Sequence, residues 1–235
     1  MPVTMTQAVA EVRALLDESA PAFWTNYQIQ SWVNQGCEDV ARRGQTLWQE
    51  AALAITPGVQ NYAFPGDFLN AHRADFSPSN SDQTYSLEFR EINAMDEIWG
   101  ILHSLPAAWP QYFTIRGVPS GYFLMLYPSP GAAGTLTVYY YRQAVAVQGY
   151  DNADALINTV FIDCISGWED IVYDYAIYKA LRAAKDSTWQ EAYQLYESNI
   201  GRMIDKTRNM TDLGSVITSG IANWPTYTYA DNGGW

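Results

Sequence analysis

Side chains that commonly carry out catalysis or bind metals are few in this chain, and their spacing fits no known site. His72 and His103 stand far apart, and Cys37 and Cys164 form no C-x-x-C pair. The zinc-binding H-E-x-x-H pattern and the glycine-rich loops that bind phosphate are also absent from the sequence. The sequence therefore predicts no metal site and no cofactor.

Two further patterns contain reactive groups in an unsuitable geometry. Gly117-Val-Pro-Ser-Gly121 has the wrong spacing for a nucleophile elbow and is more typical of a turn before a strand. Adjacent acids such as Glu169 and Asp170 point to different sides of a helix, so they do not converge on one substrate as an acid and a base must. We therefore predict no catalytic residue and a protein that is not an enzyme.

The composition indicates a folded, acidic protein. Hydrophobic residues make up 48% and aromatic residues 14% of the chain, which is more than a disordered chain contains. Its 13 Lys and Arg against 25 Asp and Glu give a formal net charge of −12, so DNA binding through clustered cations is not expected. Both cysteines are expected to be reduced and structural. We expect no signal peptide and no membrane-spanning helix, because the matching apolar runs are not visible.

Four helices are predicted from capping signals and apolar periodicity. Two of them begin with capping-box spacing, at Thr4-Met-Thr-Gln7 and at Thr25-Asn-Tyr-Gln28. The other two form an expected helical hairpin over residues 168–184 and 187–208, with Ser166 and Ser187 as their caps. We expect these four helices to form a bundle.

The central part of the chain has the alternation of strands. Strands are expected near residues 51–56, 60–64, 71–76, 85–89, 112–116, 122–127 and 136–142, with a short helix over 92–99. Short strands joined by turns such as Pro57-Gly58 favour antiparallel pairing. We expect a small antiparallel β-sheet or sandwich inserted into the helical framework.

The predicted fold class is therefore α+β, in three parts. Residues 1–50 and 150–209 form a four-helix bundle, 51–149 an inserted β domain, and 210–235 an extended C-terminal arm. The arm is too aromatic for a solvated tail and has too little periodicity for a core. It either docks onto another protein chain or folds back on its own domain. Its candidate partner-binding residues are Trp224, Tyr227, Tyr229 and Trp235.

Four motifs resemble those of the head-to-tail adaptor (connector, or head-completion) proteins of tailed bacteriophages. In chain order they are Phe23-Trp-Thr-Asn-Tyr-Gln-Ile-Gln-Ser-Trp32; Ile55-Thr-Pro-Gly-Val-Gln-Asn-Tyr62 with Phe64-Pro-Gly-Asp-Phe-Leu69; Gly117-Val-Pro-Ser-Gly-Tyr-Phe-Leu-Met-Leu-Tyr-Pro-Ser-Pro130; and Gly167-Trp-Glu-Asp through Leu181. Each motif is weak alone, but their order and spacing over most of the chain are moderately specific. The sequence departs from the family in its acidic 150–166 connection and in its aromatic arm.

The resemblance implies a non-enzymatic structural protein of the virion neck. Such adaptors form a ring, of twelve copies, that binds beneath the portal, retains or passes the genomic DNA and provides the attachment platform for the tail. The implied partners are the portal protein, a nozzle or tail-tube protein and further copies of the chain. Double-stranded DNA would pass without specific binding, no membrane would be involved, and assembly would take place in the host cytoplasm.

Acidic residues of the 150–166 connection are candidates for contact with the passing DNA. Between Arg142 and Lys179 the chain has no Lys or Arg, and this stretch includes Asp151, Asp154 and Asp163. In a ring these acids would line a lumen that repels DNA and lets it slide. The alternative is a solvated acidic loop that leads into a helix.

Cations concentrate on the predicted helical hairpin, and they are the second group of partner-binding candidates. They are Lys179, Arg182, Arg202 and Lys206. They either pair with an acidic portal or a neighbouring subunit, or form the solvated face of two helices.

An alternative hypothesis is a carbohydrate-binding or tail-fibre (receptor-binding) module. Exposed Trp and Tyr side chains stack on sugar rings in such modules, and this chain has 9 Trp and 17 Tyr. An adaptor assembles into rings or on a portal, whereas a sugar binder recognises glycans as a monomer or trimer.

Overall fold

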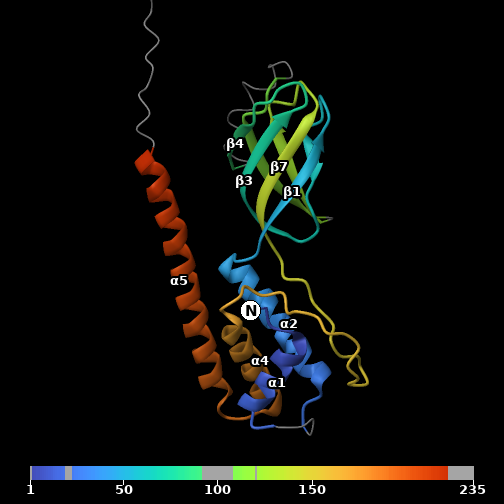
Figure 1. Cartoon of the computed structure of the whole chain (residues 1–235), viewed down its shortest axis with the longest axis vertical. Coiled ribbons are helices and arrows are strands. Elements are labelled where there is room, and N and C mark those ends of the chain that lie inside the picture. Colours follow the sequence, from blue (N-terminus) through green and yellow to red (C-terminus); the bar gives the residue numbers. More distant parts are fainter. Residues whose placement is uncertain (1, 19–22, 92–107, 120, 222–235) are drawn as a thin grey trace, which may run out of the picture.

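A β-sheet occupies one end of the molecule and helices occupy the other (Figure 1). The computed structural model describes residues 2–18, 23–91, 108–119 and 121–221, and the side chains of its last helix as far as Thr207. The short helix expected over 92–99 and the aromatic residues of the arm lie outside the described residues. Two chain segments connect the ends of the molecule, one between α2 and β1 and the other between β7 and α4.

The two predicted capping boxes are confirmed. Helix α1 (Met5–Leu15) begins after Thr4, whose side chain accepts a hydrogen bond from the backbone N–H of Gln7. Helix α2 (Asn26–Gly44) begins in the same way after Thr25. In each case the glutamine side chain accepts the backbone N–H of the capping threonine, so two helical donors are satisfied at each start.

The helical hairpin is confirmed as helices α4 (Glu169–Ala184) and α5 (Trp189–Ile221), although its caps and its end differ from the prediction. Trp168 rather than Ser166 precedes α4, and it makes no side-chain capping bond. Before α5, Asp186 accepts the backbone N–H of Thr188. The predicted end at Arg208 is wrong, because α5 continues to Ile221.

Seven described strands form one mixed sheet. They are β1 (Trp48–Ile55), β2 (Asn61–Ala63), β3 (Phe68–Pro78), β4 (Tyr85–Phe89), β5 (Tyr112–Val118), β6 (Gly121–Tyr127) and β7 (Gly134–Arg142). Their order is β1-β7-β3-β4-β5-β6-β2. All neighbouring pairs are antiparallel except β4 and β5, which are parallel.

The sheet curls into a near-barrel around a core of its own. Side chains from both halves of the strand order meet in this core, among them Phe76 and Val138 from one half and Phe113 and Leu124 from the other. Along β7 the buried residues alternate with partly exposed ones, as expected for a strand with one face inward.

The predicted four-helix bundle with a small inserted antiparallel sheet is wrong. The described chain is rich in sheet, and the sheet is a mixed, nearly closed structure. The parallel β4–β5 pair requires a crossover connection, which local alternation does not reveal. The helices differ too much in length for a regular bundle, since α5 has 33 residues, about 50 Å, and α1 has 11, about 16 Å.

The helices have a separate core. Helix α2 packs on α1 and α4, and α4 packs on α5, which runs along one side of the helical part (Figure 1). Gly36 allows the close approach of α2 and α4, because a Cβ atom there would lie 3.1 Å from Cγ1 of Val172. The centre of this core is apolar and includes Val33, Cys37 and Ile200.

Candidate functional site

The connection between β7 and α4 lies on α2, where two side-chain amides hold its backbone. Gln30 accepts hydrogen bonds from the N–H groups of Gly149 and Tyr150, at 2.6 and 2.8 Å, and donates to the carbonyl of Tyr150 at 3.2 Å. Asn34 donates to the carbonyl of Val147 at 2.9 Å and accepts its N–H at 3.1 Å. These amides pair with the extended backbone as a neighbouring strand would.

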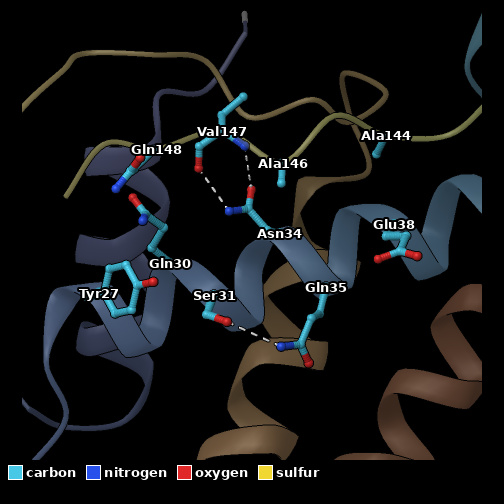
Figure 2. A pocket seen from close by; sticks show the side chains of 10 residues that line it. All are labelled: Tyr27, Gln30, Ser31, Asn34, Gln35, Glu38, Ala144, Ala146, Val147 and Gln148. Carbon is cyan, nitrogen blue, oxygen red and sulfur yellow. Dashed lines mark hydrogen bonds between the residues drawn. The ribbon is translucent and has the colours of Figure 1, made fainter. Parts of the chain in front are cut away.

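An open groove of about 410 Å³ runs beside these contacts (Figure 2). One side is a polar stripe of α2, and the other is the segment that follows β7. Among its residues, Ser31 accepts a hydrogen bond from Gln35 at 3.3 Å. The complete lining is Tyr27, Gln30, Ser31, Asn34, Gln35, Glu38, Ala144, Ala146, Val147 and Gln148.

The three candidate acids of the connection all accept hydrogen bonds within the chain. Asp151 accepts the N–H groups of Ala153 and Ala155, both at 2.9 Å, and so closes a turn. Asp154 accepts the N–H of Tyr27 at 2.9 Å at the first turn of α2, where a negative charge is favourable. These bonds explain the acids locally, and their predicted position in a DNA-facing lumen stays a prediction.

Asp163 links the last strand of the sheet to the connection through charged hydrogen bonds. Its carboxylate makes a two-pronged ion pair with Arg142, at 2.5 and 2.7 Å, and accepts the N–H of Val145 at 2.6 Å. Burial by itself would raise the pKa of Asp163, but the hydrogen bonds from Arg142 and Val145 outweigh it, and the pKa is lowered. Asp163 is therefore a paired, ionised group at neutral pH.

Large apolar side chains of the same connection face solvent. Leu156, Ile157 and Phe161 are 56%, 52% and 56% exposed. A loop of this length with several exposed apolar residues is typical of a surface that another protein covers. The first part of the connection loops out on the side away from α5, and its later part crosses back over the helices to the start of α4 (Figure 1).

The candidate cations of the hairpin are divided between its two ends. Near the α4–α5 turn, Lys179 lies over the rings of Tyr175 and Tyr178, at 5.2 and 5.6 Å, and Arg182 lies over Trp189 at 5.6 Å. At the other end Lys206 lies 5.3 Å from the ring of Trp168. Arg202 is exposed on α5. The structure therefore does not bring the four cations into one patch.

A polar network that the sequence analysis missed joins α2 to α5. Arg43 makes a two-pronged pair with Glu197, at 2.8 and 2.7 Å, and Tyr196 donates a hydrogen bond to Asp39. The hydrogen bond from Arg43 lowers the pKa of Glu197, and burial raises the pKa of Tyr196. No local spacing signals these contacts, because the partners are more than 150 residues apart.

Aromatic side chains gather where the sheet meets the helices. Trp48 on β1 contacts His72 and Tyr141 edge-on, with ring centres 4.6 and 4.7 Å away. Trp48 is exposed, so these rings form part of an open aromatic surface. Sequence reasoning missed this group, because its three members come from separate strands.

In residues 2–18, 23–91, 108–119 and 121–221, no group of three or more His, Cys, Asp or Glu is placed to hold a metal ion. None of the helices in these ranges is long and apolar enough to cross a membrane. Cys37 and Cys164 are free thiols. The candidate residues Trp224, Tyr227, Tyr229 and Trp235 lie outside these ranges.

The chain matches a known protein family over most of its length. Residues 3–219 fit the family model described as SU10 adaptor protein, so the match extends over the helices, the sheet and the connection between them. The comparison with curated proteins found no match.

Proposed function

The chain belongs to the SU10 adaptor protein family, a family of phage head-to-tail adaptors, and we propose that it works as one subunit of a ring between portal and tail. Adaptors of this kind are structural proteins and not a class of enzyme. The observation that carries the proposal is the exposed apolar surface of the 149–167 connection, which provides a contact area for another chain.

Two different exposed surfaces of the subunit support a ring. A closed ring needs contacts in which one patch of each subunit meets a different patch of the next. The connection offers the exposed Leu156, Ile157 and Phe161, and α5 offers Leu195, which is 54% exposed. Contact between these patches of successive copies would bury both.

The proposed ring would associate with the portal on one face and with a tail protein on the other, in the neck of the virion. It would contain twelve copies, as the family resemblance implies, and assemble in the host cytoplasm. The net charge of −12 favours the passage of DNA without tight binding, because phosphates are repelled. The exposed Arg202 and the aromatic-bound Lys179, Arg182 and Lys206 are available for pairing with acids of a partner.

The test is the assembly of purified adaptor with purified portal, followed by co-sedimentation. A double variant, Leu156→Ser with Ile157→Ser, removes apolar area from the connection without touching the core, and we expect it to weaken assembly by about ten-fold or more. Val59→Ser, at an exposed apolar position in the turn after β1, is the matched control and should assemble normally. Equal assembly of both variants would contradict the proposed contact.

The open aromatic surface at Trp48 favours one alternative, a carbohydrate-binding module. Trp48 and Tyr141 are the kind of rings that stack on sugars. Binding of the full chain to immobilised glycans, lost in Trp48→Ala, with no assembly on a portal, would favour this function over the adaptor.

A further inference from the structure

We propose that the groove on α2 receives the C-terminal segment of a neighbouring copy, with Thr226–Ala230 lying extended along it. The inference rests on the proposed ring and goes beyond it, since it assigns an acceptor site to a particular segment. Four observations carry it: the chemistry of the groove, its length, the pattern of the segment and the place where the described chain ends.

The groove has the chemistry that recognises an extended backbone. Gln30 and Asn34 already hold the backbone of residues 147–150 through paired donors and acceptors. Ser31 and Gln35 lie beside them on α2 and offer the same kinds of groups to the open space (Figure 2). Within the described part of the chain, the backbone N–H groups of Ala146 and Gln148 donate to no protein acceptor. They are available to a second extended segment.

The shape and charge of the groove suit a neutral segment with large side chains. Ala144 and Ala146 have small side chains, so this side of the groove leaves room for large side chains of a bound segment. Glu38 is the one charged residue of the lining. Hydroxyl groups of Thr and Tyr can donate hydrogen bonds to Glu38 and to the amide oxygens without bringing in a charge.

The length of the groove fits a short extended stretch. Along α2 it reaches from Tyr27 to Glu38, which is about 16 Å at the rise of an α-helix. Five residues in extended form span about 16 Å as well. A stretch of this length can therefore pair along the whole groove.

The chain contains a suitable stretch after its last described residue. Residues 222–235 follow α5, and within them Thr226-Tyr-Thr-Tyr-Ala230 alternates small and large β-forming side chains. Every residue of this stretch has a backbone N–H, whereas the preceding Pro225 has none. No Lys or Arg follows Arg208, so the segment brings no cation to the groove.

The direction of α5 favours a neighbouring copy over the same chain. Helix α5 runs on the side of the helical part away from the connection that borders the groove, and its end points away from α1 and α2 (Figure 1). In a ring, the side that carries α5 faces the next subunit. The segment that follows α5 would turn back along the helical part to reach that subunit's groove.

The test places a photo-crosslinker, p-benzoylphenylalanine, at position 227 of the full chain. Unlabelled and ¹⁵N-labelled copies are mixed, assembled on purified portal, irradiated and analysed by mass spectrometry. We expect cross-links that join an unlabelled to a labelled chain and map to residues 27–38 or 143–148. Cross-links only within one chain, to the portal or to another surface would each overturn the inference.

Two groove variants and a control complete the experiment. Ser31→Trp fills the groove and should lower the cross-link yield about ten-fold or more. If Ser31→Trp does not fold, Glu38→Trp tests the same prediction, since it fills the groove from an exposed position. Ser79→Trp, in the exposed turn after β3, should leave the yield unchanged. Electron micrographs of the same samples separate the two proposals. An intact ring with cross-links elsewhere refutes only the binding of the C-terminal segment in the groove, whereas absence of a ring refutes the proposed function.

Discussion

Arg142 and Asp163 tie the last strand of the sheet to the connection that leads to α4. Two hydrogen bonds join the guanidinium to the carboxylate, and the N–H of Val145 occupies a further lone pair. Paired geometry of this kind is stronger than a single ion contact. At the residue scale, this pair holds the connection against the end of β7.

The pair predicts a specific dependence of stability on pH. Because the pKa of Asp163 is lowered by folding, its contribution is fully present above the unfolded pKa of about 3.9 and is lost as the pH falls through the lowered value. We expect Asp163→Asn to reduce the free energy of unfolding at pH 7 by roughly 2 kcal/mol, and to make the loss of stability below pH about 4 less steep.

Urea unfolding at several pH values checks this prediction. Asp82→Asn, at an exposed position before β4, is the control and should unfold like the wild type. An Asp163→Asn protein with the wild-type midpoint at every pH would show that the pair contributes nothing to stability.

Sequence reasoning at this scale succeeds where partners are close in the chain. The capping boxes at Thr4 and Thr25 were predictable, because donor and acceptor are three residues apart. Pairs such as Arg142 with Asp163 depend on how the chain returns to itself, so the sequence shows the charges but not the pairing. For the same reason Asp163 was predictable as a candidate acid and not as a paired one.

Helix α2 and the connection beside it form a unit held by amides. Gln30 is only 3% exposed and satisfies two backbone N–H groups of residues that are themselves buried. A buried donor that loses its acceptor costs free energy, because water does not replace the acceptor. The position of the connection, and with it the groove, therefore depends on a few polar side chains of α2.

We expect Gln30→Ala to lower the free energy of unfolding by about 2–3 kcal/mol and to release the connection before the sheet unfolds. Hydrogen exchange at Gly149 and Tyr150 should become faster, while exchange in β3 and β7 stays slow. Gln49→Ala, at an exposed position of the edge strand β1, provides the comparison. Equal exchange at Gly149 in both variants would mean that Gln30 does not hold the connection.

Elements were easier to predict than their assembly. The strand near 136–142 could be read from alternation, since it has one face inward, and the strand near 122–127 from its run of consecutive apolar residues, four of which are buried. The parallel pairing of β4 with β5 and the closure of the sheet could not, because they depend on contacts between distant strands. The end of α5 was misplaced, because the Gly, Ser and Thr residues after Arg208 disfavour a helix, although apolar residues there keep helical spacing. These apolar residues are Met210, Leu213, Val216, Ile217 and Ile221.

At the scale of the whole molecule, the subunit has two cores and exposed surfaces between and beside them. The core of the sheet and the core of the helices are separate clusters, joined by the α2–β1 and β7–α4 segments. The exposed apolar residues belong to the β7–α4 connection itself, and the polar groove lies beside its first part. In a single subunit these contact surfaces are exposed to solvent. In the division into parts proposed from the sequence, they would lie at the border between the helical part and the β domain.

Electron microscopy of the adaptor mixed with its portal is the decisive experiment. We expect a closed ring of adaptor subunits stacked on the portal, in which the 149–167 connection of each subunit lies against the α5 side of the next. Adaptor molecules that remain single copies beside an uncovered portal, with the connection free in solution, would contradict it.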